Sequence, residues 1–306
     1  MMEHRSSRLA RAALVALAVM ALVGCASTLT VRAHPFATPS PTRQAPSANP
    51  QFRALEAQFD VRLGVYALDT GSGLALGYRG DERFAYASTI KVLAAAMLLN
   101  QTTEQQLDTL VRFDKADLLA HSPITTQRLG SGMTLRELTD AALRYSDNTA
   151  ANLIFEHIGG PSGLGAWLKR AGDGITHVDR KEPELNEASP GDIRDTSTPE
   201  ALARDLESLL IGRALAADDR AALTAWMMAN TTGGGLIRAG VQSGWKVADK
   251  SGSGGYGTRN DIAVIWPATG APIVLVVMSS SADRNAQYDD ALIVQATATA
   301  IGALRP

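Results

Sequence analysis

Strand-forming segments lie near both ends of the folded part of this chain, and helical patterns fill the stretch between them. The first two segments are joined by Thr70-Gly71-Ser72-Gly73, a turn that predicts a β-hairpin. An alanine-rich, apolar helix is expected to close the chain over residues 289–304. The five predicted strands cover 62–69, 74–78, 245–251, 261–266 and 273–279. Because both ends supply strands, the sequence predicts one sheet assembled from the two termini.

The stretch between these two groups of strands has a helical pattern from Ser88 to about Asn230. Thr134 and Glu137 are spaced as a capping box, which predicts a helix that begins there and runs to Tyr145. The sequence therefore predicts an α+β fold with a helical insertion, and a cleft at the junction is the default site. The predicted units are residues 50–84 with 229–306 for the α/β domain, and 85–228 for the all-α domain.

The amino terminus has the pattern of a targeting segment. Arg5, Arg8 and Arg11 precede an apolar run, Ala12–Val23, as in a secretory signal peptide. This run is shorter than the roughly 20 residues of a membrane-spanning helix. It ends in Leu-Val-Gly-Cys, which resembles a lipobox and predicts a signal peptide over residues 1–24 with a lipid on Cys25. An ordinary signal peptide with an incidental cysteine is the alternative.

Residues 25–49 are rich in proline, serine, threonine and alanine, a composition that predicts an extended tether. The folded part is expected to begin near Asn49-Pro50, a cap followed by a helix-start proline. Cys25 is the only cysteine, so no disulfide can form within one chain. The formal net charge is −2 with no basic block, which argues against a nucleic-acid partner. We expect an exported, periplasmic or cell-envelope protein that touches the membrane only through its lipid anchor.

Ser88 is the first candidate for chemistry. It precedes Lys91 by three residues at the start of the apolar run 92–99, which places both side chains on one face of a helix. A serine hydroxyl needs an adjacent base, and a lysine whose pKa is lowered by its surroundings can act as one. The spacing also arises by chance, because Ser243 and Lys246 share it without such a helix.

A second polar motif, Ser146-Asp147-Asn148, follows the helix that ends near Tyr145. A hydroxyl in such a loop can relay a proton, and an amide can bind a substrate carbonyl. Helix capping by the serine or the aspartate is the alternative.

A third motif, Lys250-Ser251-Gly252-Ser253-Gly254, lies at the end of a predicted strand. Strand alternation places Ser251 and Ser253 on one face and Lys250 on the other. The small residues allow a ligand to approach the backbone closely. A hairpin turn with a solvated lysine is the alternative.

Glu182 and Asn186 form a fourth motif, within a segment without periodicity over residues 179–195. The opposite charges of Arg180 and Asp195 are expected to pair and to close this segment as an Ω-loop. A carboxylate and an amide four residues apart can hold one water for attack on an ester. Exposed acidic residues on a loop are the alternative.

These motifs follow one another in the order S-x-x-K, S-D-N, E-x-x-L-N and K-S-G, and together they resemble the class A serine β-lactamases of the penicillin-binding protein superfamily. The resemblance runs from about residue 50 to the C-terminus and includes Trp226, Asn230-Thr231-Thr232-Gly233 and Ile237-Arg238-Ala239-Gly240. It implies an α/β sandwich domain, with an antiparallel sheet flanked by helices, and an inserted all-α domain. The active site would lie at the junction of the two domains.

The resemblance also implies the chemistry. Ser88 would attack the lactam carbonyl, with either Lys91 or Glu182 acting through a water as the base. The backbone N–H groups of Ser88 and Ser253 would form the oxyanion hole. Ser146, assisted by Lys250, would pass a proton to the leaving nitrogen. Glu182 and Asn186 would position the water that releases the product.

Substrate contacts follow from the same resemblance. Asn148 would bind the acylamido side chain, and Ser251 and Arg259 would hold the carboxylate. Gly252 and Ser253 would lie against the substrate along the strand, and His121 would replace an aromatic wall residue. The implied substrates are penicillins and cephalosporins, the chain would act as a monomer, and no cofactor is expected. A metal site is not expected, since His121, His157 and His177 lack ligand-like spacing.

Three other functions remain open from the residues alone. A penicillin-binding DD-peptidase acting on peptidoglycan stem peptides shares the serine and lysine motifs but normally lacks the Glu182/Asn186 pair. A non-catalytic lipoprotein that binds a wall fragment predicts no turnover of a chromogenic cephalosporin. A Ser-His-Asp triad is compatible with the spacing, although the lysines explain the serine without one.

Overall fold

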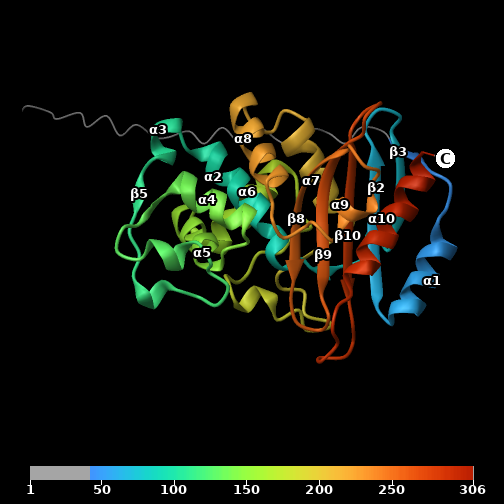
Figure 1. The fold of residues 1–306 in the computed structure, drawn as a ribbon, viewed down its shortest axis with the longest axis horizontal. Helices are drawn as coiled ribbons and strands as arrows, with labels where there is room; N and C mark the ends of the chain where they lie inside the picture. The colour runs from blue at the N-terminus through green and yellow to red at the C-terminus, as the bar shows by residue number, and fades with distance from the viewer. Residues whose placement is uncertain (1–41, 306) are drawn as a thin grey trace, which may run out of the picture. The chain divides into compact units, whose positions relative to one another are not determined.

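A computed structural model describes residues 42–305, and its centre is one six-stranded sheet (Figure 1). The strand order is β1-β3-β2-β10-β9-β8, antiparallel throughout except where β1 runs parallel to β3. The strands are β1 (Arg43–Gln44), β2 (Arg62–Asp69), β3 (Leu74–Tyr78), β8 (Lys246–Ser253), β9 (Arg259–Trp266) and β10 (Ile273–Ser280). Strand β2 pairs directly with β10, which confirms the prediction of a sheet assembled from both ends of the chain.

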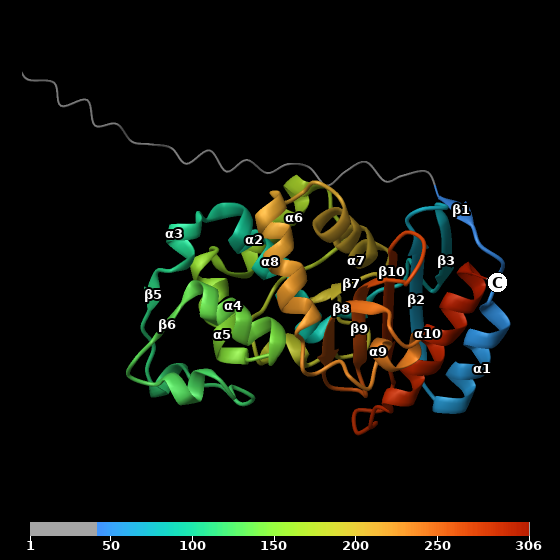
Figure 2. The ribbon, with the colours of Figure 1, turned by 45° about the horizontal axis from the view of Figure 1, so that its top comes forward.

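The two faces of the sheet bury different apolar layers. Along β2, Leu63, Val65 and Ala67 belong to one core, whereas Tyr66 and Leu68 belong to the other. This alternation follows from the two-residue period of a strand, and both layers are apolar because both faces are covered. Helices α1 (Asn49–Phe59) and α10 (Asp290–Leu304) cover the first face, and α7 (Pro199–Leu206) packs against the second (Figure 2).

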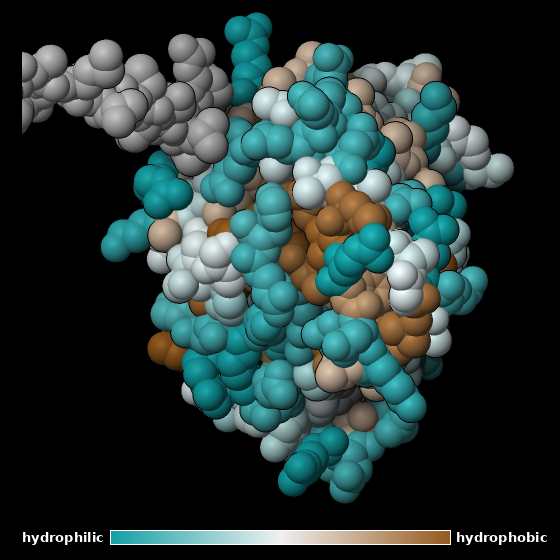
Figure 3. Space-filling view, turned by 90° about the vertical axis from the view of Figure 1, so that its left-hand side faces the viewer, coloured by the Kyte–Doolittle hydropathy of each residue, from teal (hydrophilic) through white to brown (hydrophobic). Residues whose placement is uncertain are grey.

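Helix α2 (Lys91–Gln101) is the centre of the helical part of the molecule. Its residues 91–99 are all buried, because other helices surround it and alanine lets them approach. The remaining helices of this part are α3 (Glu104–Leu107), α4 (Leu135–Arg144), α5 (Asn148–His157), α6 (Gly160–Ala171) and α8 (Ala217–Met228). Short helix α9 (Ile237–Gly240) leads back to the sheet. Figure 3 views this helical end, where apolar side chains gather at the middle of a mostly hydrophilic face.

The helical insertion contains more irregular structure than the sequence pattern predicts. Two pairs of short strands lie within or beside it: β4 (Phe84–Ala85) with β7 (Thr196–Ser197), and β5 (Leu110–Val111) with β6 (Met133–Thr134). The remaining short turns are η1 (Ala87–Ile90), η2 (Lys115–Asp117), η3 (Thr125–Arg128), η4 (Glu184–Asn186) and the π-helical η5 (Glu207–Ile211). Helix α7 lies on the sheet although it belongs to the predicted segment 85–228. The division into two domains therefore stays a proposal.

Several local predictions can be compared with the structure. Thr134 and Glu137 form the expected capping box at the start of α4. The prediction for Asn49 was wrong, since α1 begins after Ala48 and has no side-chain cap. The expected tether also ends earlier than residue 49, because β1 pairs with β3 and Ala45 and Ala48 are buried.

The signal peptide over 1–24, the lipid site Cys25 and most of the tether lie outside the described residues. Among residues 42–305, no helix combines the length and the apolar character needed to cross a membrane.

Candidate active site

Ser88 lies in the buried turn η1, which connects β4 to helix α2. The sequence pattern placed it in the first turn of one helix, but the chain enters α2 through this tighter 3₁₀ turn. Ala87 adopts a positive φ of 49°, and the Thr89 hydroxyl donates to Tyr86 O at 2.8 Å. Strand β8 approaches closely at Gly252, where a Cβ would lie 2.9 Å from Tyr86 O. The glycine thus brings the backbone of β8 against the turn that carries Ser88.

Lys91 is fully enclosed, and its ammonium has three oxygens within 3.0 Å. Nζ donates to Ser146 O at 2.8 Å and to Asn148 Oδ1 at 2.7 Å, and it lies 3.0 Å from Glu182 Oε1. Burial lowers the pKa of Lys91, and the nearby Glu182 carboxylate opposes that shift. Three acceptors around one nitrogen match the three N–H donors of a charged lysine.

Glu182 brings the Ω-loop to the serine. Its Oε1 accepts a hydrogen bond from Ser88 Oγ at 3.1 Å, and its Oε2 accepts one from Asn186 Nδ2. The sequence analysis expected a water between Glu182 and Asn186, whereas here the two side chains bond directly. The Asn186 Oδ1 atom is buried without a hydrogen-bond partner among the described residues.

Asn152 is a residue that the sequence analysis missed. Its Nδ2 donates to Glu182 O at 2.8 Å, and its Oδ1 accepts from Glu182 N at 3.0 Å. These two bonds fasten the backbone of the glutamate to helix α5. The available signal was its spacing, since Asn152 is four residues from Asn148 and shares its face of the helix.

The Ω-loop closes as predicted, through the ion pair between Arg180 and Asp195. Asp195 also accepts from Tyr86 Oη at 3.1 Å and from the backbone N–H groups of Asp179 and Arg180 at 2.9 Å. A buried carboxylate with this many donors holds both ends of the loop together. The closed loop therefore fixes the position of Glu182 relative to Ser88.

Ser146 lies between two lysines. Its backbone has a positive φ of 56°, in the loop between α4 and α5. Its Oγ accepts from Lys250 Nζ at 3.0 Å and lies 3.4 Å from Lys91 Nζ. Lys250 also donates to Ser251 O at 2.8 Å. Burial lowers the pKa of Lys250 to about 7, and the charge of Lys91 acts in the same direction.

Asp147 follows the capping alternative rather than a catalytic one. Its Oδ1 accepts from Ala150 N at 2.9 Å as the N-cap of α5, and its Oδ2 accepts from the backbones of Ile124 and Thr125. The aspartate thus holds the loop that presents Ser146.

Asn148 and His121 lie beside Ser146. The Asn148 amide is already bonded within the protein, since Oδ1 accepts from Lys91 and Nδ2 donates to Ala120 O at 3.1 Å. His121 is exposed, with a positive φ of 58° and its Nε2 3.1 Å from Tyr145 O. This position places the imidazole at the rim of the site.

Arg259 does not stand where the sequence analysis expected it. Its guanidinium binds the carboxylate of Asp290 at 2.7 and 3.1 Å and lies 4.6 Å over the ring of Tyr288. The predicted positive charge for the substrate carboxylate is therefore paired within the protein. Ser251 Oγ, on the same side of the sheet, lies 2.7 Å from Thr232 Oγ1, and Ser253 is exposed at the end of β8.

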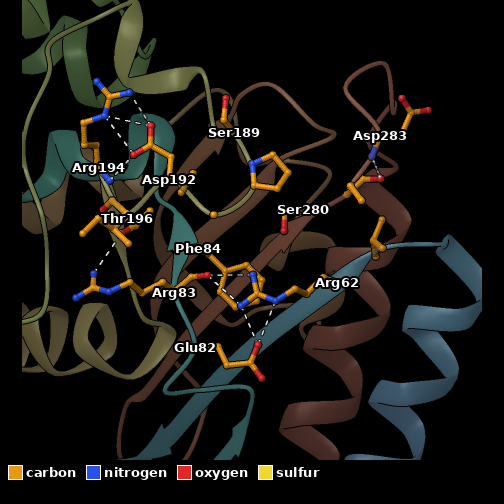
Figure 4. Close-up of a pocket in the computed structure, with 18 of the residues that line it drawn as sticks. Arg62, Glu82, Arg83, Phe84, Ser189, Asp192, Arg194, Thr196, Ser280 and Asp283 are labelled. Carbon is orange, nitrogen blue, oxygen red and sulfur yellow. Dashed lines mark hydrogen bonds and ion pairs between the residues drawn. The ribbon is translucent and has the colours of Figure 1, made fainter.

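A cavity of about 860 Å³ lies beside the Ω-loop (Figure 4). It is bounded by Ω-loop residues 188–194, by Arg62 and Phe84, and by the end of β10. Among its charged side chains, Arg62 pairs with Glu82 and Arg194 pairs with Asp192. None of the predicted site residues lines it.

Comparisons with known proteins agree with this geometry. Residues 47–304 match the model of the β-lactamase enzyme family. A β-lactamase of Amycolatopsis lactamdurans is 57% identical over 87% of this chain and 88% of its own, and one of Bacillus amyloliquefaciens is 52% identical over 84% of each.

The similar solved structures are also β-lactamases. The class A β-lactamase of Clostridium kluyveri aligns with a TM-score of 0.83 and 46% identity, covering 84% of this chain and 98% of its own. A halotolerant bacterial β-lactamase aligns with a TM-score of 0.82 and 50% identity, covering 84% and 99%. The chain therefore belongs to the class A serine β-lactamases, the enzymes that open the β-lactam amide of penicillins and cephalosporins through a serine acyl-enzyme and so confer antibiotic resistance.

Proposed function

We propose that Ser88 is the nucleophile and that Glu182 accepts its proton. The observation that carries this assignment is the contact of Ser88 Oγ and Lys91 Nζ with the same oxygen, Glu182 Oε1, at 3.1 and 3.0 Å. Lys91 is surrounded by acceptors and so is best described as an ammonium, which has no lone pair for the serine proton. Its charge instead stabilises the Glu182 carboxylate and the developing alkoxide.

Acylation then requires charge stabilisation on the carbonyl and a proton for the leaving nitrogen. The backbone N–H groups of Ser88 and Ser253 supply the oxyanion hole, because Gly252 lets β8 lie against η1. Ser146 gives its proton to the lactam nitrogen. It recovers a proton from one of the two lysines that contact its hydroxyl, Lys250 at 3.0 Å and Lys91 at 3.4 Å. The lysines regain that proton from Glu182, whose Oε1 lies 3.0 Å from Lys91 Nζ, so Glu182 is again a carboxylate when the acyl-enzyme is hydrolysed.

Substrate recognition is proposed to use the side chains at the rim of this cluster. Ser251 binds the carboxylate, and Arg259 contributes only the charge that Asp290 leaves uncompensated. Asn148 binds the acylamido group and His121 forms a wall beside it.

Release of the product depends on Glu182 and Asn186. The buried, unpartnered Asn186 Oδ1 is an acceptor for a water that Glu182 activates for attack on the acyl-enzyme. A DD-peptidase that forms long-lived penicilloyl adducts lacks this step, and the relatives named above are β-lactamases rather than DD-peptidases.

Intact-mass spectrometry with benzylpenicillin tests the assignment. In Glu182→Ala we expect acylation of Ser88 to slow, deacylation to slow further, and a penicilloyl adduct to persist for many turnover times of the wild type. Glu184→Ala, at an exposed position in the same loop, is the matched control and should turn over like the wild type. Acylation of Glu182→Ala at the wild-type rate would contradict the proton transfer to Glu182, and a long-lived adduct on the wild type would contradict its role in release.

We also propose that the chain is exported, that residues 1–24 are removed, and that Cys25 anchors a monomer to the cell envelope. The lipobox-like Leu-Val-Gly-Cys supports this proposal. Fractionation of cells that express the wild type and Cys25→Ser tests it. The wild type should stay with the membrane and carry the mass of a lipid, whereas the variant should be released.

A further inference from the structure

Thr232 lies beside the proposed carboxylate subsite, and no step of the mechanism above uses it. It belongs to the loop between helices α8 and α9 and is half-buried. Its Oγ1 lies 2.7 Å from Ser251 Oγ and 2.8 Å from Asn230 Oδ1, so it stands between a substrate-binding hydroxyl and an amide. The direction of the proton in each of these bonds decides what Ser251 can offer to a substrate.

The orientation of the Asn230 amide is determined by its other partners. Its Nδ2 donates at 2.6 Å to Oδ2 of the buried Asp249, whose other oxygen accepts from Arg238. On its opposite side the amide faces the backbone N–H of Thr232 at 3.0 Å. A backbone N–H can only donate, so the atom that faces Thr232 is the amide oxygen.

The protons of both hydroxyls follow from this orientation. Asn230 Oδ1 can only accept, so the Thr232 hydroxyl donates its single proton to it. Thr232 then has only lone pairs for its other neighbour, and Ser251 must be the donor in the bond between the two hydroxyls. In the free enzyme the chain of hydrogen bonds therefore runs from Ser251 to Thr232 to Asn230.

We propose that this two-hydroxyl chain reverses when a substrate carboxylate binds, and that Thr232 and Asn230 are positioning residues for Ser251. Ser251 turns its proton to the carboxylate, and Thr232 turns its proton to Ser251. Each proton stays on its own oxygen. Asn230 Oδ1 keeps the backbone N–H of Thr232, so reversal leaves no buried acceptor without a partner.

The reversed chain strengthens substrate binding. A hydroxyl that accepts a hydrogen bond becomes a better donor, so donation from Thr232 polarises Ser251 toward the negatively charged carboxylate. This assistance matters here because the guanidinium of Arg259 is paired with Asp290. The proposal rests on the assignment of Ser251 to the carboxylate subsite.

The test compares a penicillin with its methyl ester, which has the same ring system without the negative charge. For Thr232→Val we expect kcat/KM for the acid to fall about twofold to fivefold, mainly through KM, and kcat/KM for the ester to stay unchanged. Thr232→Ser keeps a hydroxyl and should have the wild-type kcat/KM for the acid. Thr231→Val is the matched control, since the Thr231 hydroxyl donates to Arg144 O and takes no part in the hydrogen bonds between Ser251, Thr232 and Asn230. An equal fall for acid and ester, or no fall for the acid, would overturn the proposal.

Two further measurements separate the reversal of the two-hydroxyl chain, called the relay below, from the assignment of Ser251 to the carboxylate subsite. Ser251→Ala should lower the acid-to-ester ratio by more than Thr232→Val does. If Ser251→Ala leaves the ratio unchanged, the carboxylate assignment fails and the relay with it. If Ser251→Ala lowers the ratio and Thr232→Val does not, the relay alone fails. Neutron diffraction of the wild type, which involves no variant, should place the Ser251 deuterium toward Thr232 in the free enzyme. A deuterium on Thr232 that points to Ser251 there would contradict the argument.

Discussion

Two pairs of buried ionisable side chains lie beside the Ω-loop, and they solve the problem of burial in opposite ways. In the active site Lys91 and Glu182 are enclosed together, with 1% and 0% of their side chains exposed. At the base of the loop, Asp173 lies next to Asp205 of helix α7, and both are buried. The first pair combines opposite charges, whereas the second brings two carboxyl groups together.

The second pair belongs to the structure that supports the loop. Asp173 Oδ1 accepts from the backbones of Ile175 and Thr176, and the Thr176 hydroxyl lies 2.7 Å from that of Ser197. Burial raises the pKa of Asp205 well above its usual range, and the charge of Asp173 raises it further. Two like charges in one buried site oppose each other, so the neutral form of Asp205 is favoured beside Asp173.

The comparison shows that a buried charge needs either a counterion or a proton. A counterion preserves the charge at neutral pH, which is the state that the proposed mechanism requires at Lys91 and Glu182. A proton removes the charge and makes stability depend on pH instead. One substitution in each pair separates these two solutions, and a third tests the charge of the neighbouring Lys250.

Removal of the cation from the compensated pair should have the largest effect. In Lys91→Met the buried Glu182 loses its counterion, so kcat/KM should fall at least about a thousandfold and the free energy of unfolding by about 3–5 kcal/mol. Kinetics with a chromogenic cephalosporin and urea unfolding measure both. Lys246→Met, at an exposed position of β8, is the control and should change the free energy of unfolding by less than about 0.5 kcal/mol. A Lys91→Met enzyme that retains a tenth of the activity would refute this role.

The charge of Lys250 should make activity depend on pH. Its pKa of about 7 lies below that of an unburied lysine because of burial, so its positive charge is present below pH 7 and is lost as pH rises. We expect kcat/KM to fall about tenfold per pH unit on the basic side of this value. Lys250→Arg stays protonated and should move that fall to higher pH, at a lower maximum. A pH profile over about pH 5.5–9 measures the shift; an identical basic limb in both enzymes would exclude Lys250 as its source.

A substitution in the pair of Asp173 and Asp205 should have the smallest effect, and it should raise the free energy of unfolding rather than lower it. The folded pKa of Asp205 is raised, so its contribution to stability is complete below the unfolded pKa of about 3.9 and is lost as pH rises toward the folded value. Asp205→Asn replaces the titrating carboxyl group by a neutral amide of the same size. It should therefore increase the free energy of unfolding by about 1–3 kcal/mol at pH 8 and leave it nearly unchanged or lower at pH 4. Urea unfolding at both pH values measures this difference. A lower free energy of unfolding for Asp205→Asn at pH 8 would show that the ionised carboxyl group does not destabilise the wild type.

Local pattern was sufficient for much of the fold and for the positions of the motifs. Strand alternation placed β2 and β3 at the residues where they occur, and a capping box located the start of α4. These features depend on neighbours within a few residues. The pairing of Arg180 with Asp195 also followed from the sequence, because both flank one aperiodic loop.

Contacts between side chains of distant segments were harder to predict from the sequence. The sequence analysis assigned Arg259 to the substrate carboxylate, but the start of α10 brings Asp290 to its guanidinium. Asn152 and Thr232 were given no role, because their partners, Glu182 and Ser251, are distant in sequence. A long polar side chain has several reachable partners, and only the packing of the backbone decides which one it meets.

The sequence by itself determined the nucleophile motif, the order of the four motifs and a sheet built from both ends of the chain. The tertiary structure alone decided how those motifs share protons: Glu182 against both Ser88 and Lys91, and Ser146 between two lysines. The physical reason is that residue type and periodicity specify elements locally. The energy of a buried charge depends instead on distances of about 3 Å between residues far apart in the chain, and packing sets those distances.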